Sequence, residues 1–220
     1  MAHIPITNSE VPIRLFKSDF LEFFTHIHPA VVVIIWLPVA VYFMTRAVIT
    51  RAAGVSAIYL PIGFLLGLFL WTITEYTLHR FVFHYKPRSP RQERITFLFH
   101  GIHHAQPQCK TRLVMPPVVS IPLSLIYYGL LTLILGILLG IHQWIWPIYS
   151  GLVIGYLGYD LTHYATHHFR MRQGILKFLK RYHMQHHYKT PNQRFGVSSP
   201  LWDMVFGTYP REELQTAISS

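Results

Sequence analysis

Four long apolar stretches dominate the pattern of hydrophobic and polar positions along the chain. Each is close to the roughly 20 residues that a helix needs to cross a hydrocarbon core about 30 Å thick. A chain of 220 residues has too little remaining sequence to bury four such helices inside a soluble fold. We therefore expect four transmembrane helices, over residues 29–48, 57–75, 118–140 and 144–163.

The composition favours a membrane protein over a soluble one. Hydrophobic residues make up 51% of the chain and charged residues only 13%, roughly half of the charged fraction, about 25%, of a typical soluble domain. Residues 1–19 mix polar residues with proline and contain no apolar core, so we do not expect a cleaved signal peptide. The single cysteine, Cys109, excludes an intramolecular disulfide framework.

Basic residues gather beside one set of ends of the expected helices. The chain has 19 Lys and Arg against 9 Asp and Glu, and most of the basic residues lie in residues 79–116 or after residue 163. The loops at the opposite ends contribute only Arg46 and Arg51. By the positive-inside rule, both termini and the long central connection face the cytoplasm. Nucleic acid is not an expected partner, because the basic residues flank membrane ends instead of sharing one recognition element.

Together these features predict an all-α integral membrane fold in a single domain, residues 1–220. Four transmembrane helices form two hairpins, and a cytoplasmic helical cap consists of residues 79–116 and 164–220. No repeat at a solenoid period and no low-complexity linker divides the chain.

Histidine is the unusual residue of this composition. There are 15 histidines, more than all acidic residues together, and eleven fall into four short groups on the expected cytoplasmic side. Residues three or four apart share a helix face, so the imidazoles of three groups can converge. His79 and His84 are five apart, or about 140° on a straight helix, so their helix must end, bulge or wrap around a metal. His168 points away from its neighbour. Ten candidate metal ligands remain: His79, His84, His100, His103, His104, His163, His167, His183, His186 and His187.

Ten imidazoles are more than one metal ion uses. Structural zinc takes about four ligands and favours Cys among them, whereas imidazole suits iron, copper, zinc and nickel. Two metal ions with about five nitrogens each and open positions fit the set better. We expect iron, because neutral nitrogen ligands and vacant positions suit oxygen activation, while ligand type alone leaves zinc possible in a purified sample.

The remaining histidines and a simpler role for the whole set need a separate interpretation. His3, His26, His28 and His142 fit no group and are interpreted as interfacial or incidental. A pH sensor or scattered surface residues would be the simpler interpretation of histidine enrichment. That alternative does not explain four groups with helical spacing on one side of a membrane.

Two acidic residues lie close to the histidine groups near membrane ends. Glu75 comes four residues before His79, and Asp160 comes three before His163. Acids within a membrane are costly and usually functional. We expect each carboxylate to accept the second N–H of a ligand imidazole, which fixes its tautomer. The alternative is that each carboxylate caps a helix or pairs with a nearby arginine such as Arg80.

The order of the histidine groups is H-x4-H, H-x2-HH, H-x3-HH and H-x2-HH around two apolar hairpins. This order resembles the fatty acid hydroxylase and sterol desaturase superfamily of integral-membrane, non-haem dimetal enzymes. Four further segments are similar to its fatty acid 2-hydroxylase branch, which hydroxylates the acyl chain of sphingolipids. They are residues 75–84, 112–117, 159–164 and 196–207, and the similarity covers about residues 55–210.

The resemblance implies a reaction and a set of partners. Two electrons and O2 yield an oxidant at the dimetal centre, which removes a hydrogen from C2 of the acyl chain and returns a hydroxyl. Fungal and animal members often carry a fused cytochrome b5 domain with a His-Pro-Gly-Gly haem motif, but here His28 and Pro29 precede Ala30. We therefore expect an external electron donor, a separate protein such as cytochrome b5 or ferredoxin. The expected location is the endoplasmic reticulum of a eukaryote or the inner membrane of a bacterium.

Arg112 is the candidate substrate-binding residue. It precedes an apolar run and Pro116 and Pro117 at the start of the third expected span. We expect its guanidinium to hold a carboxylate, a ceramide head group or a phosphate by paired hydrogen bonds. The alternative is an interfacial arginine that anchors the helix to lipid phosphate.

Two rival functions remain at the level of sequence. A related desaturase, or a sterol or carotenoid hydroxylase, also begins with hydrogen abstraction, so the histidine groups do not separate it from an acyl hydroxylase. A metal transporter or sensor belongs to another class. Transporter sites usually lie near the membrane midplane, whereas the ligands here gather at one face.

Overall fold

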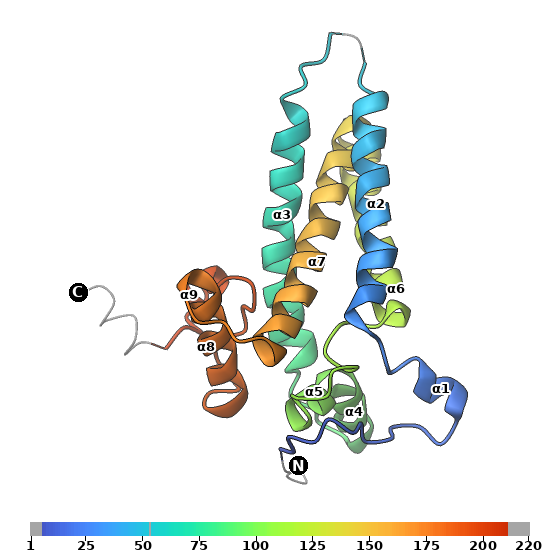
Figure 1. Ribbon diagram of the computed structural model, residues 1–220. Coiled ribbons are helices and arrows are strands. Elements are labelled where there is room, and N and C mark those ends of the chain that lie inside the picture. Colours follow the sequence, from blue (N-terminus) through green and yellow to red (C-terminus); the bar gives the residue numbers. More distant parts are fainter. Residues whose placement is uncertain (1–5, 53, 211–220) are drawn as a thin grey trace, which may run out of the picture.

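The computed structural model describes residues 6–52 and 54–210, and within these ranges every regular element is a helix. Long helices stand side by side as an upright bundle, and shorter helices gather at its lower end (Figure 1). The all-α prediction is therefore confirmed for the part of the chain that the structure describes.

The long helices coincide with the four predicted apolar stretches. They are α2 (Pro29–Ile49), α3 (Tyr59–Thr77) with its π-helical continuation η1 (Leu78–Phe83), α6 (Pro117–Leu131) with its π-helical continuation η3 (Thr132–Leu138), and α7 (Ile145–His168). Both α2 and α6 begin with proline, which suits the first helical position because its missing N–H would have no partner there. Residues 29–49, 59–83 and 117–138 are long and apolar enough to cross a membrane.

The remaining long helix, α7, occupies the centre of the bundle. It runs along α3 and α2 for much of its length, and 15 of its 24 residues are buried. Its tyrosine, glycine and aspartate residues lower its hydropathy, and it is not among the three helices with the composition of a membrane span. Protein, rather than open surroundings, covers most of its polar groups.

Two glycines permit the close approach of α3 and α7. A Cβ atom added to Gly67 would lie 2.0 Å from the carbonyl oxygen of Ile148, and one added to Gly151 would lie 2.0 Å from that of Phe64. Neither distance is sterically possible, so any side chain at these positions forces the helices apart. The two glycines thereby set the spacing of the two helices that carry histidines at their lower ends.

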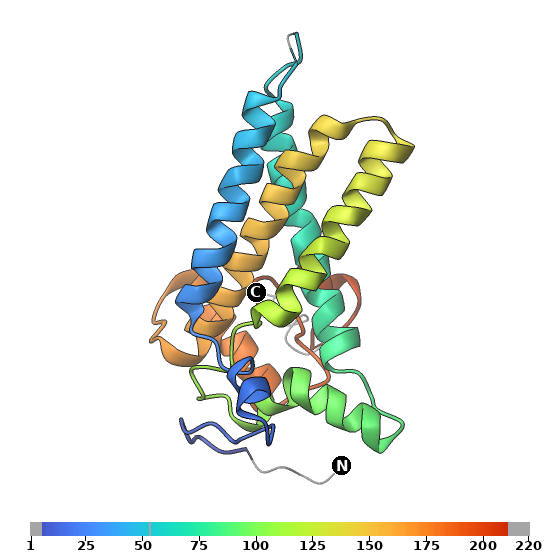
Figure 2. The same ribbon diagram turned by 90° about the vertical axis from the view of Figure 1, so that its right-hand side faces the viewer.

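The outer surfaces of the bundle are apolar. Ile34 of α2, Leu125 of α6 and Ile137 of η3 are 70%, 63% and 70% exposed. In Figure 2, η3 stands apart from the upper ends of α2 and α3. A continuous band of exposed aliphatic side chains is typical of a surface in contact with lipid.

The short helices at the lower end form the structural cap. They are α1 (Asp19–Phe23), α4 (Pro90–Thr96), η2 (Phe97–Gly101), α5 (Ile102–Ala105), α8 (Gly174–Tyr188) and α9 (Leu201–Val205). The 3-10 turn η4 (His142–Trp144) lies at the opposite end, between η3 and α7. The two segments predicted to form the cap thus meet in space at one end of the bundle, as far as they are described.

Residues 6–27, which we call the N-terminal segment, lie across the cap. The Thr7 N–H donates to the carbonyl of Ala105 at 2.8 Å, and the Ile27 N–H donates to that of Thr111 at 2.8 Å. Between these points, the side chain of Gln106 accepts from the Ile13 N–H at 2.9 Å. The segment is therefore attached at three points to the chain that connects α5 with α6.

Candidate metal centre

The ten predicted ligands lie in two compact clusters at the cap end of the bundle. Within each cluster, one ligand atom from every histidine lies within 4.8 Å of those from the others. The first His group consists of His79, His84, His100, His104 and His186. The second His group consists of His103, His163, His167, His183 and His187.

The π-helical turn η1 brings His79 and His84 to one side of their helix. The His84 N–H donates to the carbonyl of His79 at 3.0 Å, a bond between residues five apart. A π-helix is defined by this i to i+5 pattern and is frequent at functional sites. The predicted departure from a straight helix is therefore confirmed.

Two helical segments divide their histidines between the groups. η2 and α5 send His100 and His104 into the first His group and His103 into the second. The three histidines of α8 are divided in the same manner. At the boundary, the rings of His104 and His187 stack with their centroids 4.1 Å apart. The two groups thus form one continuous site on shared helices.

The distances between ring nitrogens suit the coordination of metal ions. Nε2 of His100 lies 3.1 Å from Nε2 of His79 and 3.0 Å from Nε2 of His104. In the second His group, Nε2 of His103 lies 2.9 Å from Nε2 of His163. Two nitrogens at right angles around an ion, each bonded at about 2.1 Å, are about 3.0 Å apart. The nitrogens are therefore spaced like neighbouring ligands of a five- or six-coordinate ion.

Backbone carbonyls orient two of the rings toward the centre of the first His group. Nδ1 of His79 lies 2.5 Å from the carbonyl of Phe195, and Nδ1 of His186 lies 2.7 Å from that of Gln193. A carbonyl only accepts, so Nδ1 carries the proton and the Nε2 lone pair faces inward. Nε2 of His186 then faces Nε2 of His84 at 3.0 Å. Several inward lone pairs at this separation fit a bound cation.

Burial keeps these imidazoles neutral. Burial, followed by the neighbouring histidines, lowers the pKa of His84 to about 2. Burial also lowers the pKa of His186 to about 4, although its hydrogen bond to the Gln193 carbonyl acts in the opposite direction. At neutral pH the rings are uncharged and present the lone pairs that metal binding requires.

Glu75 supports the first His group through a loop. Its Oε1 accepts from the N–H groups of Val197 at 2.6 Å and Ser198 at 2.8 Å, and its Oε2 accepts from the Ser198 hydroxyl. These partners differ from the imidazole, or Arg80, that we expected from the sequence. The physical reason is that the chain after Phe195 returns over this face of α3 and offers unpaired amides. Glu75 thereby fixes the loop whose carbonyl orients a ligand.

Asp160 acts in the same way beside the second His group. Its two carboxylate oxygens accept from the Met115 N–H at 3.3 and 3.2 Å. Asp160 thus contacts the backbone of the segment that leads into α6, where we expected an imidazole. Asp160 holds this segment against α7, one helical turn from His163.

An apolar cavity of about 350 Å³ lies beside both His groups. Its lining includes His100 from the first His group, and His103 and His163 from the second. Aliphatic and aromatic side chains from the N-terminal segment, η2, and the start of α6 form most of the remaining walls. Arg112 is the only lysine or arginine among the described residues that line it. The cavity can therefore take a hydrocarbon chain with one polar end.

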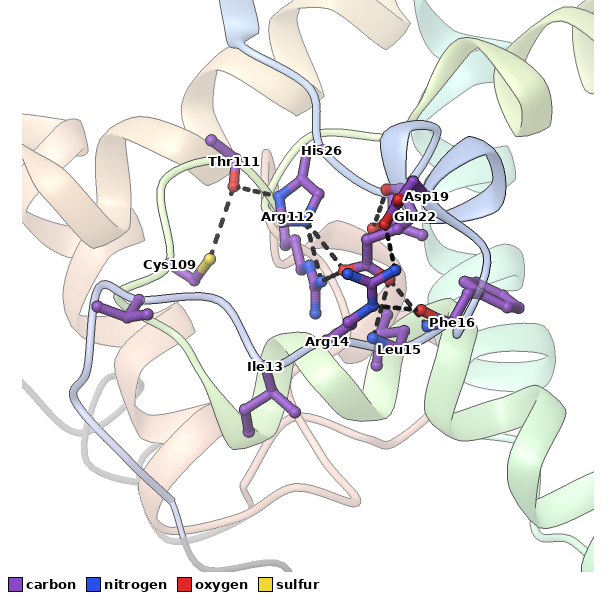
Figure 3. Close-up of polar contacts among 12 residues, drawn as sticks. Ile13, Arg14, Leu15, Phe16, Asp19, Glu22, His26, Cys109, Thr111 and Arg112 are labelled. Carbon is purple, nitrogen blue, oxygen red and sulfur yellow. Dashed lines mark hydrogen bonds and ion pairs between the residues drawn. The ribbon is translucent and has the colours of Figure 1, made fainter.

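Arg112, which lines this cavity, belongs to a polar cluster with Glu22 and His26 (Figure 3). Its Nη2 donates to Oε1 of Glu22 at 2.6 Å and lies 3.1 Å from Nε2 of His26. Nε and Nη1 of Arg112 are buried and have no hydrogen-bond partner within the described chain. An unpaired buried guanidinium edge beside a cavity is a binding group for oxygen atoms of a ligand.

The structure also shows the surroundings of histidines that are not among the ten predicted ligands. His26, interpreted from sequence as incidental, belongs to the cluster around Arg112. His28 caps α2 by accepting from the Ala30 N–H at 3.2 Å. His168 lies outside both His groups, as predicted, and His3 lies outside the described residues.

A family model settles the class of the protein. Residues 64–208 match the model described as fatty acid hydroxylase. The chain belongs to the fatty acid hydroxylase family. The matched range contains both His groups, Glu75, Arg112 and the loop after Phe195. The resemblance predicted from the histidine spacing is thereby confirmed.

Named relatives place the chain among 2-hydroxylases. It is 38% identical over 208 residues to dihydroceramide fatty acyl 2-hydroxylase FAH1 of Arabidopsis thaliana, covering 94% of this chain and 84% of that protein. It is 39% identical over 194 residues to ceramide very long chain fatty acid hydroxylase scs7 of Schizosaccharomyces pombe, covering 87% of this chain and 53% of that protein. The family members with these names are oxidoreductases, and so is this chain.

A solved structure has the same fold. The structure of full-length scs7p, in which only the hydroxylase domain is visible, matches with a TM-score of 0.79 and 38% sequence identity. The match covers 89% of this chain and 71% of that one. The arrangement of bundle and cap is thus shared with an enzyme of the same family.

Proposed function

We propose that this chain is a membrane-bound, O2-dependent, non-haem dimetal oxygenase that hydroxylates C2 of a lipid acyl chain. The substrate is a fatty acid or an acylated sphingolipid such as a ceramide. The observation that carries the proposal is the apolar cavity lined by histidines of both His groups and by Arg112, whose Nε and Nη1 have no hydrogen-bond partner among the described residues. The names of the relatives, dihydroceramide and ceramide hydroxylases, support this substrate class.

The ten histidines hold two metal ions in this proposal, with iron as the functional metal and zinc as a substitute in purified protein. Bound iron supplies the activation of O2 and the oxidising power to break a C–H bond. The overall reaction combines the C–H group, O2, two electrons and two protons to give C–OH and water. The electrons come from a separate protein such as cytochrome b5 or ferredoxin.

The chain itself determines which carbon reacts. The apolar walls hold the acyl chain and exclude water, and the Nε and Nη1 groups of Arg112 hold an oxygen at its polar end. Because C2 is adjacent to the carbonyl carbon, fixing that end fixes the position of C2 relative to His100, His103 and His163. Such positioning of a reacting atom is a major part of enzymatic rate enhancement.

The membrane arrangement belongs to the same proposal. Residues 1–220 act as one domain, and α2, α3, α6 and α7 with their continuations cross the bilayer as two hairpins. The cap faces the cytoplasm, which the distribution of Lys and Arg supports. The membrane is that of the endoplasmic reticulum in a eukaryote, or the inner membrane in a bacterium.

Lipid extracts from expressing cells test the proposal. Cells with the unchanged protein should contain acyl lipids with an added oxygen at C2, detected by mass spectrometry with fragment assignment. His103→Ala, which removes a ligand facing the cavity, should abolish this product. His168→Ala is the matched control, because it removes an imidazole outside both His groups. A new double bond in place of the hydroxyl, or full hydroxylation by His103→Ala, would contradict the proposal.

A further inference from the structure

The N-terminal segment contributes a carboxylate that pairs with Arg112, a residue of the cavity wall. Glu22, on α1, accepts through Oε2 from the N–H groups of Leu15 at 2.9 Å and Phe16 at 2.8 Å. Its Oε1 accepts from Nη2 of Arg112 at 2.6 Å, and the side chain is only 14% exposed. Both carboxylate oxygens of Glu22 are therefore used within the protein (Figure 3).

This carboxylate is ionised. Burial acts to raise the pKa of Glu22, but the hydrogen bonds from Phe16, His26 and Leu15, together with the charge of Arg112, lower it overall. The pair of Glu22 and Arg112 consequently has no net charge. In a partly buried place, loss of either partner would leave an uncompensated charge, which is costly.

The guanidinium still has binding capacity after this pairing. Nη2 of Arg112 serves Glu22, while Nε and Nη1 have no partner among the residues that the structure describes. These two N–H groups need oxygen acceptors, but their positive charge already has a counter-charge. A second carboxylate would be desolvated beside Glu22 and repelled by it. An amide carbonyl or a hydroxyl supplies the acceptor without that penalty.

We propose that Glu22 determines the charge class of the substrate. By neutralising Arg112, it makes the polar end of the cavity select an uncharged, oxygen-bearing head group over a free carboxylate. The amide and hydroxyl groups of an N-acylated sphingoid base have this chemistry. This inference rests on the proposed function, since it names the substrate class of the same cavity.

Competition between two lipids with the same acyl chain tests the inference. The reconstituted metalloenzyme is offered a ceramide and the corresponding free fatty acid together with an electron donor. The unchanged protein should favour the ceramide. Glu22→Gln should shift the ratio of kcat/KM toward the free acid by about tenfold or more, because a charge-assisted hydrogen bond from Arg112 becomes available to the carboxylate.

Two further variants separate charge from structure. Glu10→Gln removes another carboxylate of the N-terminal segment, whose exposed ion pair with Lys110 spans 3.0 Å, and it should leave the ratio unchanged. Arg112→Gln combined with Glu22→Gln removes both charges and should restore the preference for the ceramide. If Glu22→Gln does not fold, Arg112→Gln alone tests the inference. It should shift the ratio of kcat/KM further toward the ceramide, because the remaining carboxylate of Glu22 should exclude the free acid more strongly.

A binding measurement makes failure of this inference distinguishable from failure of the proposed function. Retention of radiolabelled ceramide and fatty acid is measured on metal-loaded protein without an electron donor. A shift toward the free acid in Glu22→Gln supports the inference even if neither lipid is hydroxylated. A folded Glu22→Gln variant with unchanged preference in both assays, or an unchanged protein that prefers the free acid, overturns it.

Discussion

Glu75 shows that a carboxylate can serve a metal centre without touching a ligand. Its oxygens hold the N–H groups of Val197 and Ser198, and this loop presents the Phe195 carbonyl to Nδ1 of His79. The orientation of the imidazole thus depends on a carboxylate two contacts away. Outer contacts of this kind fix the orientation of a ligand imidazole and thereby contribute to metal affinity.

Replacement of Glu75 by glutamine tests this dependence. Glu75→Gln loses one acceptor oxygen, so the loop should loosen and the bound metal per chain, or kcat/KM, should fall by about 10- to 100-fold. Metal content is measured by mass spectrometry on purified protein, and activity by the C2-hydroxylated product. Glu93→Gln, an exposed change on α4, is the control. Unchanged metal and turnover in Glu75→Gln would contradict this role.

At the scale of residues, the sequence predicted the side chains that converge in the His groups but not the backbone groups that orient them. The ten histidines could be selected because helical spacing makes their imidazoles converge. The carbonyl acceptors of Phe195 and Gln193 could not be predicted from the sequence. Every residue has a carbonyl, and only the folded chain brings a particular one to an imidazole ring. His26 was missed for a related reason: its partners Glu22 and Arg112 are far apart in sequence from each other.

At the scale of elements, the α3–α7 contact determines where the ligand-bearing helix ends lie. The contact depends on Gly67 and Gly151, which have no room for a Cβ atom. By contrast, a Cβ atom added to Gly158, which also lies in α7, would meet nothing within 4 Å. The helix therefore contains its own control for the effect of added volume.

Alanine substitutions compare these two positions. Gly151→Ala should lower the stability by about 1–3 kcal/mol through overpacking and reduce metal retention, because α3 and α7 separate. Gly158→Ala should leave both unchanged or raise the stability slightly, since alanine favours helix. Thermal unfolding in detergent and metal content give the two readouts. Equal behaviour of the two variants would show that the close approach is not required.

The helices themselves were predictable because length and apolar composition are properties of a local stretch of sequence. Predicted and observed boundaries agree within about two residues for α2, for α3 and for α6 taken together with η3, whereas α7 continues to His168, beyond its predicted end at residue 163. A departure from a straight helix between His79 and His84 was also predictable, because a straight helix would point the two imidazoles in different directions. Its π-helical form and the neighbouring η2 turn depend on packing in the cap, which local sequence does not encode.

At the scale of the whole molecule, the electron donor that we propose needs a docking surface, and exposed cations gather on one part of the cap. Lys86, Arg88, Arg91 and Arg94 are all exposed around α4. Complementary charge accelerates association, and salt reduces the effect because the screening length falls to about 8 Å at physiological ionic strength. We therefore place donor docking on this face of the cap.

Salt dependence of turnover tests this placement. With an acidic donor protein, the rate at limiting donor concentration should fall steeply as ionic strength rises. The rate with a small uncharged reductant should change little, because it needs no charged docking surface. Stopped-flow reduction and product formation measure the two rates. A rate with the acidic donor that is independent of salt would exclude electrostatic docking at the cap.

The class of fold and the membrane character could be predicted for the whole molecule from hydropathy and charge alone. The cavity could not. It exists because the N-terminal segment crosses to residues 105–112 and contributes walls such as Leu15 and Phe16. Contacts between residues about 90 positions apart follow from tertiary packing, and one sequence carries no local signal for them.

The position of α7 has a consequence for biogenesis. A helix interrupted by tyrosines, glycines and an aspartate partitions poorly into lipid by itself. In this chain α7 is also made last of the long helices, after α2, α3 and α6. The groove that buries it is therefore already synthesised when it emerges from the ribosome. Insertion of α7 therefore includes an assembly step, in which α7 packs against helices that have already been made instead of against lipid.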